Sequence, residues 1–330
     1  MLLAWVRFEN SSSSTNSKSY LIRVSGTNVM SLKKEFQFKD RLIKGIDRDG
    51  AFKISVVKTT DVVRTARENH KLSLLNTVLL GRALTASMLL ASELKGEERI
   101  KLRFEGKGPS GMIIAEANRV GEVRGYVQNP AAELVYSEPD TQLGDGLGLG
   151  LMTVSKILYN EAEPKTSTIE LLQGDIISDV AHYMAQSEQV LSALLLDVSI
   201  NDDGSVKESG GVLIQRLPDA EDSVMTTLQE TVENLSPVAK LLEDGKYIDE
   251  IMTMAGLPYS VKELDRQPVD FFCRCSPERF KNALSMLSYE ELKEMEGESQ
   301  EVVCHYCGNR LIISKEEMQG LAELAKAKLN

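Results

Sequence analysis

The chain has 330 residues, of which 42% are hydrophobic and 26% charged, so it is long enough for about two domains with apolar cores. Asp and Glu number 49 against 38 Lys and Arg, and the resulting net charge of −11 argues against a nucleic-acid binder, which needs a basic face. No apolar run reaches the ~18 residues of a membrane-spanning helix, so we expect no membrane span.

Residues 1–35 differ in composition from the rest of the chain. They include four consecutive serines and five basic residues, and Glu9 is the only acid before Glu35. Serine-rich, acid-poor, basic leaders are typical of organelle transit peptides. The alternatives are a disordered extension, or translation that begins at Met30. We therefore expect a cytoplasmic protein, or one of a plastid or other organelle if this segment is a transit peptide.

Residues 36–218 show strand and helix patterns in mixed order. Alternating, β-branched or turn-flanked sequences predict strands over 51–58, 100–106, 111–116, 122–127, 192–200 and 210–217. Helical patterns predict a helix over 60–69, capped by Thr60 or Asp61, and a longer buried helix over 72–94. Because strands and helices do not alternate regularly, we expect an α+β core domain rather than a doubly wound sheet.

Two glycine-rich stretches in this core share residues with nucleotide-binding motifs but lack the sequence context that those motifs require. Gly106-x-Gly108-x-x-Gly111 is followed by a predicted strand, whereas the dinucleotide fingerprint needs a helix there. The stretch 144–150 has no Lys-Ser or Lys-Thr after it, as a P-loop would. His70 and His182 lie apart from any nucleophile pattern, and the default for both is a surface or core position. We therefore predict no catalytic site.

Residues 219–268 carry a different pattern. Apolar residues recur there at helical spacing, at Val224, Leu228, Val232, Leu235, Val238, Leu241 and Leu242. Ser236-Pro237 predicts a break into two helices, and Gly256-Leu257-Pro258 predicts the end of the helical region. This helical linker is either a small subdomain or a cover lying on the preceding sheet.

The terminal segment, residues 269–330, contains every cysteine of the chain. They form a C-x-C pair and a C-x-x-C pair separated by 28 residues, namely Cys273, Cys275, Cys304 and Cys307. Four thiolates complete a tetrahedral zinc shell with no open position. Ser276 and Pro277 predict the start of a helix between the pairs. A module this small has too few large apolar side chains to be stable by core packing alone, and a bound metal would stabilise it. The sequence therefore predicts one Zn²⁺ at these four residues.

A zinc site can be purely structural, but two features favour a redox switch. A C-x-C pair is unusual in a zinc ribbon, and a disulfide across one residue closes a tight ring of the labile, regulatory class. Zinc also holds sulfur as the thiolate, which is the form that oxidants attack. His305 lies between the second two cysteines, and we expect a neighbour of the site or a surface residue there rather than a substitute ligand.

Two other functions remain open from the residues alone. The first is a thiol–disulfide oxidoreductase that uses Cys304 and Cys307, although that motif normally starts a helix and here 309–313 predicts a returning strand. The second is a zinc-ribbon nucleic-acid binder. Residues 269–330 contain eight Lys and Arg against eleven Asp and Glu, so this module lacks the basic charge that such binding requires.

The cysteine pairs, as they stand in FFCRCSPERF and VVCHYCGNRL, resemble those of the heat-shock protein 33 family, the 33 kDa chaperonins. Further matches are LGRALTA at 80–86, EGKGPSG at 105–111, GYVQNP at 125–130 and SEQ at 187–189. The resemblance covers roughly residues 38–325. Residues 1–35 depart from the family pattern, since family proteins lack an extended leader.

The resemblance implies a core domain at 36–218, a metastable helical linker at 219–268 and a zinc-binding redox-switch domain at 269–330. The implied activity is that of a redox-regulated holdase chaperone, which is not an enzyme. Its implied partners are unfolded or oxidatively damaged client proteins and, when it is oxidised, a second copy in a homodimer.

The resemblance also implies roles for the four cysteines. In the reduced state, all four would ligate one Zn²⁺. On oxidation, Cys273 would pair with Cys275 and Cys304 with Cys307, and the zinc would leave. These pairings rest on the resemblance alone.

Overall fold

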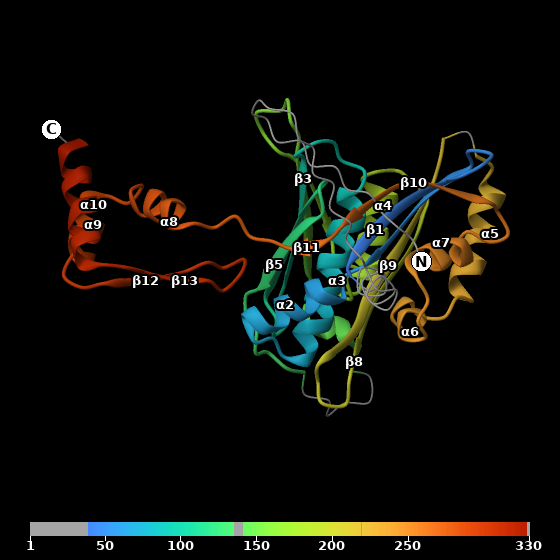
Figure 1. Ribbon diagram of the computed structural model, residues 1–330, viewed down its shortest axis with the longest axis horizontal. Coiled ribbons are helices and arrows are strands. Elements are labelled where there is room, and N and C mark those ends of the chain that lie inside the picture. Colours follow the sequence, from blue (N-terminus) through green and yellow to red (C-terminus); the bar gives the residue numbers. More distant parts are fainter. Residues whose placement is uncertain (1–38, 135–140, 219, 329–330) are drawn as a thin grey trace, which may run out of the picture. The chain divides into compact units, whose positions relative to one another are not determined.

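The computed structural model describes residues 39–134, 141–218 and 220–328 (Figure 1). The expectations for the leader at 1–35 fall outside these residues. Within them, strands and helices follow one another in mixed order and form two large sheets and one small hairpin. The predicted α+β fold class is confirmed.

The first sheet has five strands, each antiparallel to its neighbours. In sheet order they are β10 (Val261–Pro268), β1 (Arg41–Asp47), β2 (Phe52–Lys58), β9 (Val206–Arg216) and β8 (Ser192–Ile200). The predicted strand at 51–58 is confirmed as β2, and the predicted hairpin is formed by β8 and β9. The sequence patterns do not predict β1 or the edge strand β10.

The second sheet has six strands, and only β11 is parallel to its neighbour. In sheet order they are β11 (Asp270–Phe271), β5 (Glu122–Val127), β4 (Met112–Asn118), β3 (Arg99–Gly106), β6 (Gly150–Ile157) and β7 (Lys165–Glu170). The predicted strands at 100–106, 111–116 and 122–127 are confirmed as β3, β4 and β5. Strand β4 directly follows the glycine-rich turn at 106–111, as expected.

Helix α3 (Leu74–Ala91) lies between the two sheets (Figure 1). It packs against β3, β4 and β5 on one side and against β2, β8 and β9 on the other. By length and composition α3 could cross a membrane, but most of it is buried inside the fold. Core packing therefore explains its apolar sequence. Helix α2 (Thr60–His70) packs against α3, and α4 (Ile177–Gln186) packs against β8.

The start of α2 differs from the prediction. Thr60 and Asp61 are not its cap: the cap position is Thr59, whose side chain makes no capping hydrogen bond. The carboxylate of Asp40 takes this role instead, because its Oδ2 accepts a hydrogen bond of 2.8 Å from the backbone nitrogen of Val62. A residue just before β1 therefore caps a helix that follows β2, which local sequence could not indicate.

The linker contains three helices rather than the predicted two. They are α5 (Asp222–Glu233), α6 (Val238–Glu243) and α7 (Ile248–Ala255). The break at Ser236-Pro237 is confirmed, and a second break occurs at Gly245, whose φ of +81° suits glycine. The predicted end of the helical region at 256–258 is confirmed, and β10 follows it.

Of the two arrangements considered for the linker, the structure has the cover (Figure 1). Helices α5, α6 and α7 pack on the five-stranded sheet and form a second core with it. The sheet contributes Ile43, Phe52, Ile54, Val56, Val212 and Ile214, all at most 1% exposed. The linker contributes Met225, Leu228, Val232, Val238, Leu241, Leu242, Ile248, Ile251, Met252 and Ala255. We call this set the linker core.

The terminal segment has a hairpin and three helices. These are α8 (Pro277–Leu284), α9 (Tyr289–Met295), β12 (Gln300–Val303), β13 (Arg310–Ile313) and α10 (Lys315–Lys328). The predicted cap at Ser276 is confirmed, because its hydroxyl accepts a hydrogen bond from the backbone nitrogen of Arg279. Its core is small and has five buried residues, Leu284, Leu292, Ile313, Met318 and Ala322.

Candidate metal centre

The first cysteine pair lies on a short arm that leaves the six-stranded sheet. Strand β11 pairs with β5, and the backbone nitrogen of Phe272 donates to the carbonyl oxygen of Val123 at 2.9 Å. Cys273 and Cys275 follow at once, and helix α8 begins two residues after Cys275. The sheet on one side and a capped helix on the other therefore hold this arm.

The second pair lies in the tight turn between β12 and β13. The backbone nitrogen of Cys304 donates to the carbonyl oxygen of Asn309, and that of Gly308 donates to the carbonyl oxygen of Cys304, both at 2.8 Å. Gly308 has a φ of +68°, and a Cβ there would lie 2.7 Å from the carbonyl oxygen of Asn69 in α2. Glycine is therefore required both by the turn and by its contact with the core.

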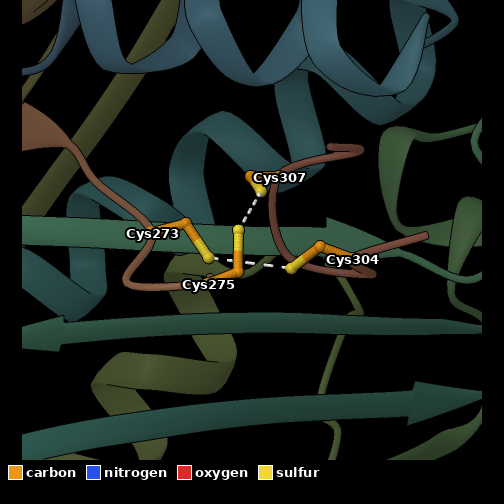
Figure 2. A group of neighbouring side chains, drawn as sticks. All are labelled: Cys273, Cys275, Cys304 and Cys307. Atoms are coloured by element: carbon orange, nitrogen blue, oxygen red, sulfur yellow. Dashed lines mark hydrogen bonds between the residues drawn. The ribbon is translucent and has the colours of Figure 1, made fainter. Parts of the chain in front are cut away.

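The two arms bring all four sulfur atoms within 4.8 Å of one another (Figure 2). The Sγ atoms of Cys273 and Cys304 are 3.7 Å apart, and those of Cys275 and Cys307 are 3.4 Å apart. None of the four forms a disulfide. In a tetrahedral site with Zn–S bonds of ~2.3 Å, ligand sulfurs lie ~3.8 Å apart. The four cysteines therefore fit a closed tetrahedral zinc shell in both donor type and spacing.

The pKa values of Cys273, Cys304 and Cys307 are shifted, and not all in the same direction. Burial raises the pKa of Cys304 and of Cys307. Burial also acts to raise the pKa of Cys273, but hydrogen bonds from the Cys275 backbone, the neighbouring thiols and Arg124 lower it overall. Four thiolates this close together repel one another, so a divalent cation is the partner that makes them compatible.

His305 is not part of the four-sulfur group. Its ring lies against that of Tyr126, with centroids 5.8 Å apart, so it is a neighbour of the site. His70 is not isolated: its Nε2 lies 3.1 Å from the carbonyl oxygen of Tyr306, in the C-x-x-C turn. Sequence reasoning missed this contact, because His70 belongs to α2 and is 236 residues away in the chain.

The position of the C-x-x-C pair disfavours the oxidoreductase alternative. Cys304 and Cys307 lie in a turn between two antiparallel strands rather than at the start of a helix. A helix N-terminus is what lowers the pKa of the attacking thiol in such enzymes. Here burial instead raises the pKa of both thiols.

Comparisons with known proteins give one consistent family. A family model described as "Hsp33 protein" matches residues 40–314. The chain is similar to the 33 kDa chaperonin of Desulforamulus reducens, with 35% identity over 88% of this chain and 99% of the relative. It is also similar to that of Thermus thermophilus, with 38% identity over 85% of this chain and 86% of the relative.

A solved structure shows the same fold. The crystal structure of the 33 kDa chaperonin (heat shock protein 33 homolog) from Thermotoga maritima matches with a TM-score of 0.81 and 32% identity. The match covers 87% of this chain and 99% of that chain. The chain therefore belongs to the Hsp33 family, a family of chaperones.

Proposed function

We propose that this protein is a redox-regulated holdase, which prevents aggregation of unfolded proteins once oxidation has formed two disulfides and released zinc. One observation carries the proposal. The first pair of a four-cysteine cluster lies a few residues after β10, beyond the short strand β11, and β10 follows the helices that cover an apolar sheet face. Chemistry at the cysteines is thereby connected along the chain to the exposure of that face.

In the reduced state, the four cysteines would hold one Zn²⁺, which closes the terminal module. Bound zinc in small modules contributes about 10–16 kcal/mol of apparent free energy. A core of five buried apolar residues cannot replace a contribution of that size. We therefore assign the stability of residues 269–328 to the metal site, and treat 269–330 as the redox-switch domain.

On oxidation, Cys273 would pair with Cys275 and Cys304 with Cys307. Two equivalents of peroxide would accept four electrons and, with four protons from solvent, give four waters, while Zn²⁺ leaves. Two sulfur–sulfur contacts of the reduced cluster join the two arms, at 3.7 and 3.4 Å. Disulfides within each pair leave no sulfur bridge between the arms, so the module would open.

The linker would lose support in turn. Only Val269 separates β10 from β11, and its backbone nitrogen donates to the carbonyl oxygen of Asp40 at 3.1 Å. Within the described residues, strand β10 lies at the edge of its sheet and β1 is its one partner. When the module opens, β10 and then α7, α6 and α5 would be free to leave the sheet. We treat residues 219–268 as the metastable linker on this basis and 36–218 as the core domain.

Release of the linker would expose the sheet side of the linker core. Six fully buried aliphatic and aromatic side chains would then face solvent, which is the kind of surface that captures unfolded chains. The net charge of −11 would keep the protein soluble in that state. A second copy is another natural occupant of such a face, so we include an oxidised homodimer in the proposal.

An aggregation assay tests the proposal directly. Reduced, zinc-loaded protein and peroxide-treated protein are each added to a chemically denatured client, and light scattering is followed. We expect suppression at near-stoichiometric ratios by the oxidised form only, together with zinc release and binding of an apolar dye. Equal activity of the two forms, or zinc release without new dye binding, contradicts the proposed coupling.

The compartment is part of the proposal. Four free thiols in a zinc site need a reducing compartment, so we place the protein in the cytoplasm. An organelle such as a plastid is the alternative if residues 1–35 are a transit peptide. Fluorescent fusions with and without residues 1–35 separate the two: only a transit peptide makes the localisation depend on that segment.

A further inference from the structure

Arg124 of β5 contacts both arms of the cysteine cluster from the core side. Its Nη1 donates to the Sγ of Cys273 at 3.8 Å. Its guanidinium carbon lies 4.1 Å from the centroid of the Tyr306 ring, and Tyr306 lies between Cys304 and Cys307. One core side chain therefore joins the C-x-C arm to the C-x-x-C turn.

Arg124 is itself held in place by the sheet. Its Nη2 donates to Oε1 of Glu116 in β4 at 2.7 Å, and the two residues are directly opposite each other in the β4–β5 register. The hydroxyl of Tyr306 donates to the second carboxylate oxygen of Glu116 at 3.2 Å. The side chains of Arg124 and Glu116 are only 20% and 10% exposed, so solvent screens this pair weakly.

Helix α2 also contacts the C-x-x-C turn. Nε2 of His70 donates to the carbonyl oxygen of Tyr306 at 3.1 Å, and Gly308 packs against the carbonyl oxygen of Asn69. The ring of Tyr126 meets that of Tyr306 edge-on, with centroids 5.4 Å apart. The turn therefore packs against α2, β4 and β5. Non-covalent contacts with the core hold it in place, in addition to the covalent chain.

The charge of the cluster changes between the two redox states. Four thiolates with one Zn²⁺ carry a net charge of −2, whereas two disulfides without zinc carry none. Arg124 is the cation that contacts this charge in the described part of the chain. On oxidation it would lose its anionic partner at Cys273 while Glu116 remains.

We propose that Arg124 is a positioning residue, which seats the zinc-loaded cysteine cluster on the core and slows zinc release. The inference rests on the proposed zinc site. It means that the contact between β5 and the cluster is strong when the cluster is negatively charged and weak when it is neutral. Removing a hydrogen-bonding partner of a ligand typically lowers metal affinity by about 10–100-fold. We expect an effect of that size for Arg124.

The test compares Arg124→Met with Arg124→Lys and with Arg103→Met. Arg103 lies on the same outer face of the sheet but pairs with Glu105 and makes no contact with the module among the described residues. Zinc release from reduced protein into a chromophoric chelator, without oxidant, is the first readout. We expect release about 10–100-fold faster for Arg124→Met, a smaller increase for Arg124→Lys, and no change for Arg103→Met.

Substitution with Co²⁺ separates an electrostatic role from a purely structural one. Without the Arg124 hydrogen bond, the sulfur lone pairs of Cys273 rise in energy, so the thiolate-to-cobalt charge-transfer band should move to longer wavelength in Arg124→Met. If that variant does not fold, Tyr306→Leu removes the stacked ring without altering β5 and should also speed zinc release. An unchanged release rate and band in every folded variant overturns the proposal. If the oxidised wild-type protein does not suppress client aggregation, but zinc release and the cobalt band change as expected in the variants, the proposed function is overturned and the role of Arg124 is not.

Discussion

The carboxylate of Asp197, on β8, accepts a hydrogen bond of 2.5 Å from the backbone nitrogen of Val238, the first residue of α6. A core strand therefore caps a linker helix. The end of the same helix is tied to β9 by an ion pair of 2.8 Å between Glu243 and Lys207. The linker is held at defined polar points as well as by its apolar face.

We predict that Asp197→Ala weakens the attachment of α6 without unfolding the core. A lost helix cap costs about 1 kcal/mol, or roughly a fivefold change in the opening equilibrium. Amide hydrogen exchange of residues 238–243 in the reduced protein should therefore quicken about fivefold. Asp202→Ala, in the exposed turn of the β8–β9 hairpin, is the matched control and should leave this exchange unchanged. Equal exchange in the two variants would mean that the cap contributes nothing to linker attachment.

The apolar face of α7 gives a second prediction. Ile251 is fully buried in the linker core, whereas Thr253 is on the exposed side of the same helix. Truncating a buried Ile to Ala costs about 2–5 kcal/mol. If this cost falls on the linker, Ile251→Ala should bind an apolar dye and be cleaved by protease within 219–268 while still reduced. Thr253→Ala should behave as the wild type, and resistance of both variants would contradict a weakly held linker.

The cysteine cluster is the part of the molecule that the sequence predicts best. Ligand chemistry and short spacing are local, so Cys273, Cys275, Cys304 and Cys307 are identified without a structure. Arg124 shows the limit of this reasoning. It lies 149 residues from Cys273 in the chain, and their contact depends on the pairing of β5 with β11. No local pattern carries that information.

The strands also differ in whether the sequence predicts them. Strands β2 and β5 are predicted because buried and half-buried residues follow the pattern of a strand packed on a core. Strand β7 has one buried residue, Ile169, and β10 has none. Both are edge strands with polar sequences, so hydrogen bonds to a neighbouring strand define them rather than any pattern of their own.

Removing one ligand gives a third prediction. Cys304→Ser should bind less than one equivalent of zinc, because a serine hydroxyl is a poor replacement for a thiolate. The small core of the module cannot compensate, so limited proteolysis should cut between residues 269 and 328 while strands β1 to β9 stay intact. Met286→Ser is the control, since Met286 is 87% exposed in the same module. Native protease resistance in Cys304→Ser would show that the module folds without its metal.

Asp40 gives a prediction about pH. Its side chain is buried, one carboxylate oxygen accepts from Val62, and the other has no partner among the described residues. Burial raises the pKa of Asp40 to about 7, against an opposing effect of the Val62 hydrogen bond; Asp61 adds to the rise and Lys58 reduces it. The folded chain therefore holds a proton on Asp40 between about pH 4 and pH 7 that the unfolded chain has lost.

The sign of the effect follows from proton binding. Because the folded state binds the extra proton, the contribution of Asp40 to the free energy of unfolding is fully present below about pH 4 and is lost as the pH rises through 7. Asp40→Asn cannot ionise but keeps an oxygen that accepts from Val62. Its stability relative to the wild type should therefore rise by about 2–3 kcal/mol between pH 5 and pH 8.

Urea unfolding of both proteins at several pH values measures this difference. Titration of the thiols and of other carboxylates affects both proteins alike and cancels in the comparison. Hydrogen exchange of α2 provides a local readout, since Asp40 caps that helix through Val62. A difference that stays constant from pH 5 to pH 8 would mean that Asp40 remains ionised in the folded chain. In that case solvent or a cation must reach its second oxygen, because a buried carboxylate is otherwise too costly to keep charged.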